Sequence, residues 1–282
     1  MMDFLKKHIV YVFILMISAA SCIERIDIMT DYISSRLVVY GYITTDAKRH
    51  EIRITRSAGY FTEDSPAGVS GAAVTISDED GNIFYLDENP EDPGLYQTAD
   101  DVRGEEGKTY TLDVLSDAQH YRASARIAHL NDIDSVRLRN SAFSENRVEL
   151  LVFADMPEGN HYSIFVSVND SLRNATINRF RVRSNIVNGM TIYVLRKSPE
   201  DGDEENNNLL RPGDKVTVNI NAISEEYATF ISAAQTELSG SIPIFSGPPA
   251  NVPSNIREVN TNTPALGFFT AFPSRYADVT YQ

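Results

Sequence analysis

From Arg36 onward, hydrophobic positions mostly alternate with polar ones, which is the pattern of β-strands that bury one face. In residues 50–56, Ile52 and Ile54 fall on one face, and charged or polar residues fall on the other. The same alternation recurs in residues 74–77, 109–114 and 121–127. Turn sequences such as Asp-Gly-Asn and Asp-Pro-Gly separate these runs. The pattern therefore predicts a β-sandwich over residues 36–128.

A second series of expected strands follows residue 128. Their apolar positions are Val136 and Leu138, 148–153, Tyr162 to Val168, Phe180 and Val182, 192–195, and Val216 to Ile220. Residues 200–208 hold five acidic residues and three Asn, and are expected to form a solvated hairpin tip. The series predicts a second β-sandwich over residues 129–282, so the expected fold class is all-β with two sandwich domains.

One segment has a helical period instead. Ser224 can cap a helix, and Glu225 and Glu226 suit its first turn. The apolar residues on one face are Tyr227, Phe230, Ile231, Ala234 and Leu238. We expect an amphipathic helix over about 224–239 that packs on the second sandwich. A partner-binding or cofactor-lining role for this face is the alternative interpretation.

The first 22 residues have the layout of a secretory signal. Lys6 and Lys7 precede a short apolar run, and Ser-Ala-Ala-Ser leads directly into Cys22, the only cysteine. This arrangement predicts a bacterial lipoprotein signal over residues 1–21, cleavage before Cys22, acylation of its sulfur, and a tether over residues 22–35. An ordinary signal with an incidental cysteine and an uncleaved membrane anchor are the alternatives.

The charge balance excludes some classes of partner. The chain has 25 Lys and Arg against 39 Asp and Glu, a formal charge of -14. Nucleic-acid binding depends on clustered Lys and Arg, so we expect no nucleic-acid partner. The same sign disfavours electrostatic adhesion to anionic lipid. With 42% hydrophobic and 23% charged residues, the composition is that of a globular protein.

Motifs for catalysis or metal binding are incomplete. Gly104–Thr109 resembles the end of a phosphate-binding loop, but Val102 stands where that loop needs glycine. Gly68–Ala72 likewise lacks the last glycine of a nucleophile elbow. The four histidines after the signal are not at metal-ligand spacing, and the acids at 201, 203 and 205 lack the rest of a calcium loop. We expect no enzyme, no metal and no cofactor, although a catalytic site assembled only in three dimensions remains an alternative.

Several segments together resemble a known family. They are residues 22–27, 36–44, 245–256 and 266–269. On them the chain resembles the domain-of-unknown-function family DUF4249. The resemblance implies a lipoprotein of the Bacteroidota outer membrane, a class often found beside TonB-dependent receptors, and it brings no established catalytic or ligand residues. The first sandwich, particularly residues 69–125, also resembles small Ig-like or transthyretin-like sandwiches.

The segment 245–256 is rich in proline, which stiffens a long connection. One interpretation is a rigid contact loop for a receptor or ligand, with Phe245, Pro248, Pro249, Asn251 and Pro253 as its candidate residues. The other is a structural strap that packs Phe245, Val252 and Ile256 on the second sandwich.

Together these features predict a non-enzymatic protein anchored to the outer membrane through lipidated Cys22, on its surface-exposed or periplasmic face. Its expected role is that of an accessory or binding partner of a TonB-dependent receptor. The alternative role is a free-standing surface module that binds a glycan or peptide. Trp is absent, so a glycan would have to stack on Tyr.

Overall fold

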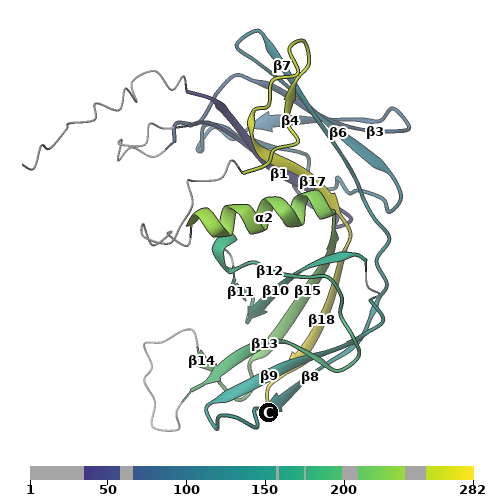
Figure 1. The fold of residues 1–282 in the computed structure, drawn as a ribbon, viewed down its shortest axis with the longest axis vertical. Helices are drawn as coiled ribbons and strands as arrows, with labels where there is room; N and C mark the ends of the chain where they lie inside the picture. The colour runs from purple at the N-terminus through teal and green to yellow at the C-terminus, as the bar shows by residue number, and fades with distance from the viewer. Residues whose placement is uncertain (1–34, 58–65, 157–158, 175, 199–208, 239–251) are drawn as a thin grey trace, which may run out of the picture. The chain divides into compact units, whose positions relative to one another are not determined.

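The computed structural model describes residues 35–57, 66–156, 159–174, 176–198, 209–238 and 252–282 (Figure 1). Within these residues the chain is all-β apart from helix α2 (Glu225–Leu238) and one short 3-10 turn, η2 (Ile177–Arg179). The strands form three sheets, and the expected all-β fold with one helix is confirmed.

The first sheet has nine strands in the order β16-β7-β6-β3-β4-β5-β2-β1-β17. Their bounds are β1 (Leu37–Thr44), β2 (Glu51–Arg56), β3 (Ala73–Asp78), β4 (Ile83–Glu88), β5 (Leu95–Gln97), β6 (Thr109–Ser116), β7 (Gln119–Arg126), β16 (Arg257–Glu258) and β17 (Leu266–Phe272). Alternate residues of β1 and β2, such as Val39 and Ile54, share one buried core with Ile76 and Leu112 of β3 and β6. The two ends of this long sheet therefore face each other as a sandwich.

Two of the turns in the first sheet depend on glycine. Gly81 in the β3–β4 hairpin has a φ of +88°, and the Asp78 carboxylate accepts hydrogen bonds from the backbone N–H groups of Asp80 and Asn82. Gly94 has a φ of +83°, and a Cβ there would lie 2.4 Å from the Ile54 carbonyl oxygen. Only glycine fits this position without moving the backbone of β2.

Two smaller sheets form the second sandwich. The four-stranded sheet has the order β14-β13-β9-β8, the other has the order β11-β10-β15-β18, and β12 also pairs with β10. Their bounds are β8 (Ile133–Asn140), β9 (Arg147–Ala154), β10 (His161–Val168), β11 (Ser171–Leu172), β12 (Arg181–Arg183), β13 (Met190–Lys197), β14 (Leu209–Leu210), β15 (Lys215–Ile223) and β18 (Ser274–Thr280). Val148, Leu150, Ile164 and Val218 belong to the core between these sheets.

The chain returns to the first sheet after the helix. Residues 256–272 lie in the range expected for the second sandwich, yet β16 pairs with β7 and β17 pairs in parallel with β1. In β17 five consecutive residues are buried, from Phe268 to Phe272. A strand covered on both faces loses the alternation by which the other strands are recognised. For this reason the sequence pattern did not predict β17.

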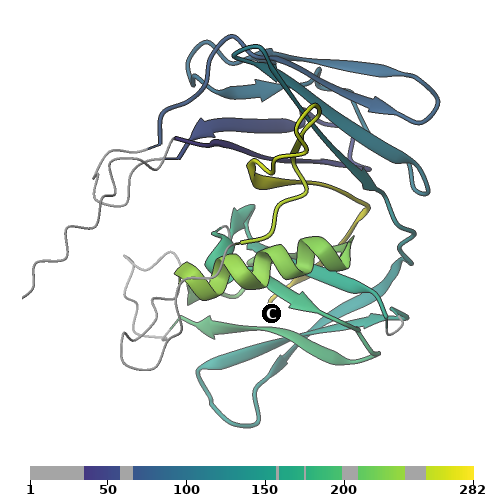
Figure 2. The ribbon, with the colours of Figure 1, turned by 45° about the horizontal axis from the view of Figure 1, so that its top comes forward.

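Helix α2 begins as expected, because the Ser224 hydroxyl accepts a hydrogen bond of 3.1 Å from the Tyr227 backbone N–H. It packs on the second sandwich at η2, where the Gln235 amide donates to two backbone carbonyls at 2.8 Å. Figure 2 shows helix α2, in light green, on the side of the second sandwich that faces the first sheet. The helix also packs on the first sheet, since Phe230 lies against Phe268 of β17 with ring centroids 5.2 Å apart. The predicted apolar face is wrong at Leu238, which is 60% exposed at the end of the helix.

Several expectations lie outside the described residues, namely the signal, Cys22, the tether and the acidic segment 200–208. In the part of the chain that the structure describes, no helix is long and apolar enough to cross a membrane.

Candidate functional site

A pocket of about 310 Å3 lies against the sheet formed by β10, β15 and β18. Tyr40 and Tyr42 of β1, together with Tyr227 and Ile231 of α2, line it from the other side. The residues that the sheet and its connections contribute are Ser163, Phe165, Ser167, Leu172, Phe180, Thr217, Asn219, Asn221, Phe272, Ser274 and Tyr276, and Lys48 completes the lining. The pocket therefore combines aromatic rings with neutral polar side chains.

Strand alternation produces this lining. On β15, the apolar residues Val216, Val218 and Ile220 enter the core, so the residues between them face the pocket. The strand register then aligns the pocket residues in rows across three strands. The rows are Ser163–Asn221–Ser274, Phe165–Asn219–Tyr276 and Ser167–Thr217–Asp278, of which Asp278 does not line the pocket.

The innermost row is a fixed network of hydrogen bonds. The Ser274 hydroxyl donates to Asn221 Oδ1 at 2.7 Å, and Asn221 Nδ2 donates to Asn219 Oδ1 at 3.0 Å and to the Ser163 hydroxyl at 3.3 Å. Asn221 and Ser163 are 1% and 2% exposed. Buried amides are costly unless they are paired, so this network holds Asn219 and its neighbours in one orientation.

The middle row places Asn219 between two aromatic residues, Phe165 and Tyr276. The Phe165 ring is fixed by an edge contact with Phe180, with ring centroids 4.8 Å apart. Tyr276 is 54% exposed, and its hydroxyl donates a 2.6 Å hydrogen bond to Asp46. Polar groups flanked by ring faces suit a ligand that has both hydroxyl groups and apolar faces.

The opposite wall is made of tyrosines that stay neutral. The hydroxyls of Tyr40 and Tyr227 are 2.8 Å apart and share a hydrogen bond. Burial raises the pKa of both phenols above its usual value, so neither ionises at physiological pH. Lys48 stands near this wall, with its Nζ 5.5 Å from the centroid of the Tyr42 ring and 3.5 Å from Asp46.

The charge of the pocket limits its chemistry. Of the described residues that line it, Lys48 alone carries a charge. The carboxylate of Asp46 contacts two lining residues, since it accepts a hydrogen bond from Tyr276 and lies 3.5 Å from Lys48 Nζ. Over the described part of the chain, no three His, Cys, Asp or Glu side chains gather closely enough to hold a metal ion.

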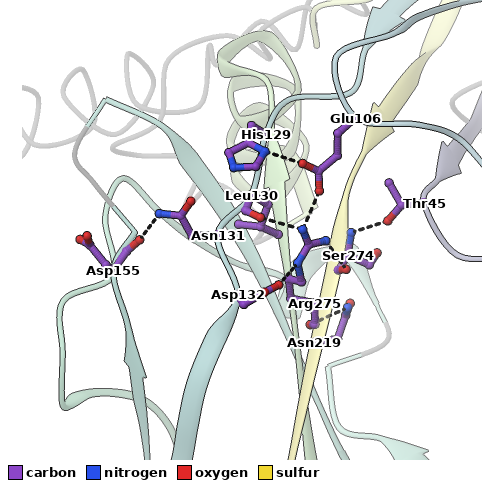
Figure 3. Close-up of polar contacts among 10 residues, drawn as sticks. All are labelled: Thr45, Glu106, His129, Leu130, Asn131, Asp132, Asp155, Asn219, Ser274 and Arg275. Carbon is purple, nitrogen blue, oxygen red and sulfur yellow. Dashed lines mark hydrogen bonds and ion pairs between the residues drawn. The ribbon is translucent and has the colours of Figure 1, made fainter.

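Arg275 holds β18, and with it one wall of the pocket, in place (Figure 3). Its guanidinium donates to Glu106 at 2.7 Å, to Asp132 at 2.6 Å and to the Leu130 carbonyl at 2.8 Å. The other carboxylate oxygen of Glu106, Oε2, lies 2.6 Å from His129 Nδ1 and forms a hydrogen bond with it. Since Arg275 lies between Ser274 and Tyr276 in sequence, these contacts fix the strand that presents both residues to the pocket.

Comparison with known proteins decides the family. The family model described as "Domain of unknown function (DUF4249)" matches residues 23–276. The chain belongs to this family. No curated protein matches this DUF4249 chain. One similar solved structure, a "putative carbohydrate binding protein" from Bacteroides uniformis, shares 11% identity over 66% of this chain and 89% of that chain, with a TM-score of 0.17. A likeness at that score carries no argument about this protein.

Of the candidate residues in the proline-rich segment, the structure describes Pro253 alone. Cys22, Phe245, Pro248, Pro249 and Asn251 lie outside the described residues, and Pro253 is exposed and is not among the residues that line the pocket.

The strap interpretation needs a correction. Ile256 is buried in the core of the first sandwich, whereas we expected it on the second. The reason is Asn255, whose side-chain amide exchanges two hydrogen bonds with the backbone of Phe269 and so directs the segment to β17.

Most pocket residues of this DUF4249 protein were not predicted as site residues. Tyr227 and Ile231 are on the helix face for which a partner-binding or cofactor-lining role was the alternative interpretation. Asn219 and Asn221 occupy the polar positions of an alternating strand, which favour a solvated face in sequence analysis. Their signal is weak but present: β-strands are depleted in Asn, and here two stand two residues apart on one face.

Proposed function

We propose that this DUF4249 protein is a non-enzymatic, lipid-anchored outer-membrane protein that binds a neutral saccharide in the pocket between β15, β1 and α2. The observation that carries this proposal is Asn219, held by a buried amide network between the rings of Phe165 and Tyr276. Amides form directional hydrogen bonds with sugar hydroxyls, and aromatic faces pack on the C–H faces of sugar rings.

The size and charge of the pocket favour a short neutral glycan. A volume of about 310 Å3 is at the low end of the usual range for small-molecule sites, roughly 300–1,000 Å3. The pocket therefore suits a monosaccharide or the end of a chain. A peptide ligand is less well supported, because peptide sites of the strand-addition type use a free sheet edge, and this pocket is lined by a sheet face.

The anchor and the receptor are further parts of the proposal. The anchor is supported by the small residues before Cys22, and the association with a TonB-dependent receptor is supported by the family resemblance. Incorporation of an acyl label that is lost in Cys22→Ser tests the anchor. Purification of a C-terminally tagged chain from its own outer membrane, with or without a stoichiometric β-barrel protein, tests the partner.

The ligand is tested on a glycan array with residues 22–282 carrying Cys22→Ser, which retains every described residue. We expect binding to neutral glycans that is lost in Asn219→Leu and retained in Tyr85→Ala. Tyr85 is a matched control because it is an exposed aromatic residue on β4, outside the pocket. An array without neutral-glycan signals, or equal signals from all three chains, would contradict the proposal.

A further inference from the structure

The outer face of the four-stranded sheet in the second sandwich is rich in arginine. The core residues of β8, β9 and β13 alternate with residues that point away from the core. Four of these outward positions are Arg137, Arg139, Arg147 and Arg196, and all four side chains are exposed. In a chain with a formal charge of -14, this is a local concentration of positive charge.

Acidic residues compensate only part of this charge. Glu149 lies on the same face and is bound by Arg139 at 2.5 Å. Arg147 and Arg196 are directly opposite each other across β9 and β13. Like charges at such a position repel, and no carboxylate in the described residues forms an ion pair with either of them. This arrangement is stabilised when an anion lies between the two guanidinium groups.

The surface at this position is hollowed. An open groove of about 360 Å3 is lined by Arg147, Arg196 and Lys197, together with Ser144, Asn146 and Leu209. The residues that line it carry two guanidinium groups, an ammonium group and a serine hydroxyl, which are the kinds of donor from which phosphate oxygens accept hydrogen bonds.

An exposed aromatic residue lies beside the groove. Phe143 is 95% exposed in the turn between β8 and β9. The turn is ordered by hydrogen bonds from the backbone N–H of Arg147 to the Ser144 carbonyl at 3.2 Å and from that of Ser141 to the Arg147 carbonyl at 2.9 Å. The same few residues therefore present to solvent an apolar side chain and an arginine that forms no ion pair within the described residues.

We propose that this face is a docking surface for anionic phospholipid. Lipid phosphates would occupy the groove between Arg147 and Arg196, while Phe143 enters the interface between headgroups and acyl chains. Cations combined with an exposed aromatic residue are the features that hold peripheral proteins on anionic membranes. The net charge disfavours such adhesion, but charges farther than about 8 Å are largely screened at physiological salt, so the residues nearest the lipid contribute most.

The proposal agrees with the position of the saccharide pocket. The pocket lies on the outer side of the sheet β10-β15-β18, and the arginine face is on the outer side of the opposing sheet. Docking through the arginines would leave the pocket directed away from the lipid. The inference builds on the proposed membrane location, but its test needs neither the lipid anchor nor the ligand.

The absence of Trp from the chain allows a direct measurement. Phe143→Trp, in residues 22–282 with Cys22→Ser, provides a single tryptophan at the proposed contact. We expect its emission to shift to the blue with vesicles of phosphatidylcholine and phosphatidylglycerol, and to be quenched by brominated acyl chains. Pure phosphatidylcholine vesicles and soluble glycerol phosphate should leave the emission unchanged.

Two further variants test the role of charge. Arg147→Glu with Arg196→Glu should weaken vesicle binding by at least about tenfold, because each basic residue at the surface contributes to the attraction. Arg126→Glu with Arg257→Glu, exposed positions of the first sheet, makes the same change in net charge and should bind as before. Both pairs are checked by circular dichroism. An unshifted emission with anionic vesicles, or equal losses in the two folded pairs, would overturn the proposal.

Discussion

At the scale of single residues, buried His50 and half-buried Arg275 determine how the protein responds to pH and to mutation. His50 is 1% exposed, its Nε2–H donates to the Val102 carbonyl at 3.0 Å, and its Nδ1 has no hydrogen-bond partner within the described residues. Burial, aided by the nearby charge of Lys48, lowers its pKa from 6.5 to about 4. The folded protein therefore holds this ring neutral in a range where the unfolded chain is protonated.

The first prediction follows from the sign of this shift. Between pH 6.5 and 4 the unfolded state binds more protons at His50, so stability should be full at pH 7.5 and fall as the pH decreases, by about 3 kcal/mol at the limit. Urea unfolding at pH 7.5 and 4.5 measures the effect. His50→Gln should lose less stability on acidification than the unmodified chain, whereas the control His161→Gln, at a half-buried position at the start of β10, should behave as the unmodified chain does. If His50→Gln and the unmodified chain lost equal stability between pH 7.5 and 4.5, the pH dependence would not come from His50.

The second prediction concerns Arg275. Its replacement by Met leaves Glu106 and Asp132 without their shared cation, so we expect a loss of roughly 2 kcal/mol in the free energy of unfolding. Arg49→Met is the control, because its ion pair with Asp100 is exposed and should contribute less than about 1 kcal/mol. Denaturant titration of both variants measures the difference. An equal loss of unfolding free energy in Arg275→Met and Arg49→Met would contradict a larger contribution from the Arg275 contacts.

At the scale of elements, the sequence predicted those strands that have one buried and one polar face. Such strands alternate, as β2, β6, β10 and β15 do, and the helix was recognised by its cap and its period. The two-residue strands β11, β14 and β16 were missed because they are too short to show a period, and β17 was missed for another physical reason. A strand buried on both faces carries no alternation, and its parallel partner β1 is separated from it by more than 200 residues along the chain.

The pairing of β1 with β17 gives the third prediction. Gly267 has a φ of +91°, and a Cβ there would lie 2.0 Å from the Val39 carbonyl oxygen. Gly267→Ala should therefore destabilise the protein by more than the ~1–3 kcal/mol of backbone strain alone. Gly71→Ala is the matched control, since Gly71 has a φ of +74° with nothing within 4 Å of the added atom. Thermal unfolding compares them, and a smaller effect at Gly267 would contradict the tight pairing.

At the scale of the whole molecule, function depends on surfaces that no single segment contains. The pocket joins β1, α2 and three strands of the second sandwich, so Tyr40 and Asn219 come together only in the folded chain. The alternation in the local sequence predicts that Asn219 points away from the core of its sandwich. It does not predict that β1 and α2 cover this face and so form a pocket over it. The same applies to charge, because the net value of -14 does not reveal four arginines on one face.

Calorimetric titration measures saccharide binding at Asn219 directly. A neutral glycan selected on the array is titrated into the unmodified chain, Asn219→Ala and Tyr85→Ala. We predict binding that weakens at least about tenfold in Asn219→Ala, because a lost hydrogen bond in a desolvated pocket costs ~1–3 kcal/mol. Tyr85→Ala should bind as the unmodified chain does. Equal affinity in Asn219→Ala, with its fold intact by circular dichroism, would contradict the account.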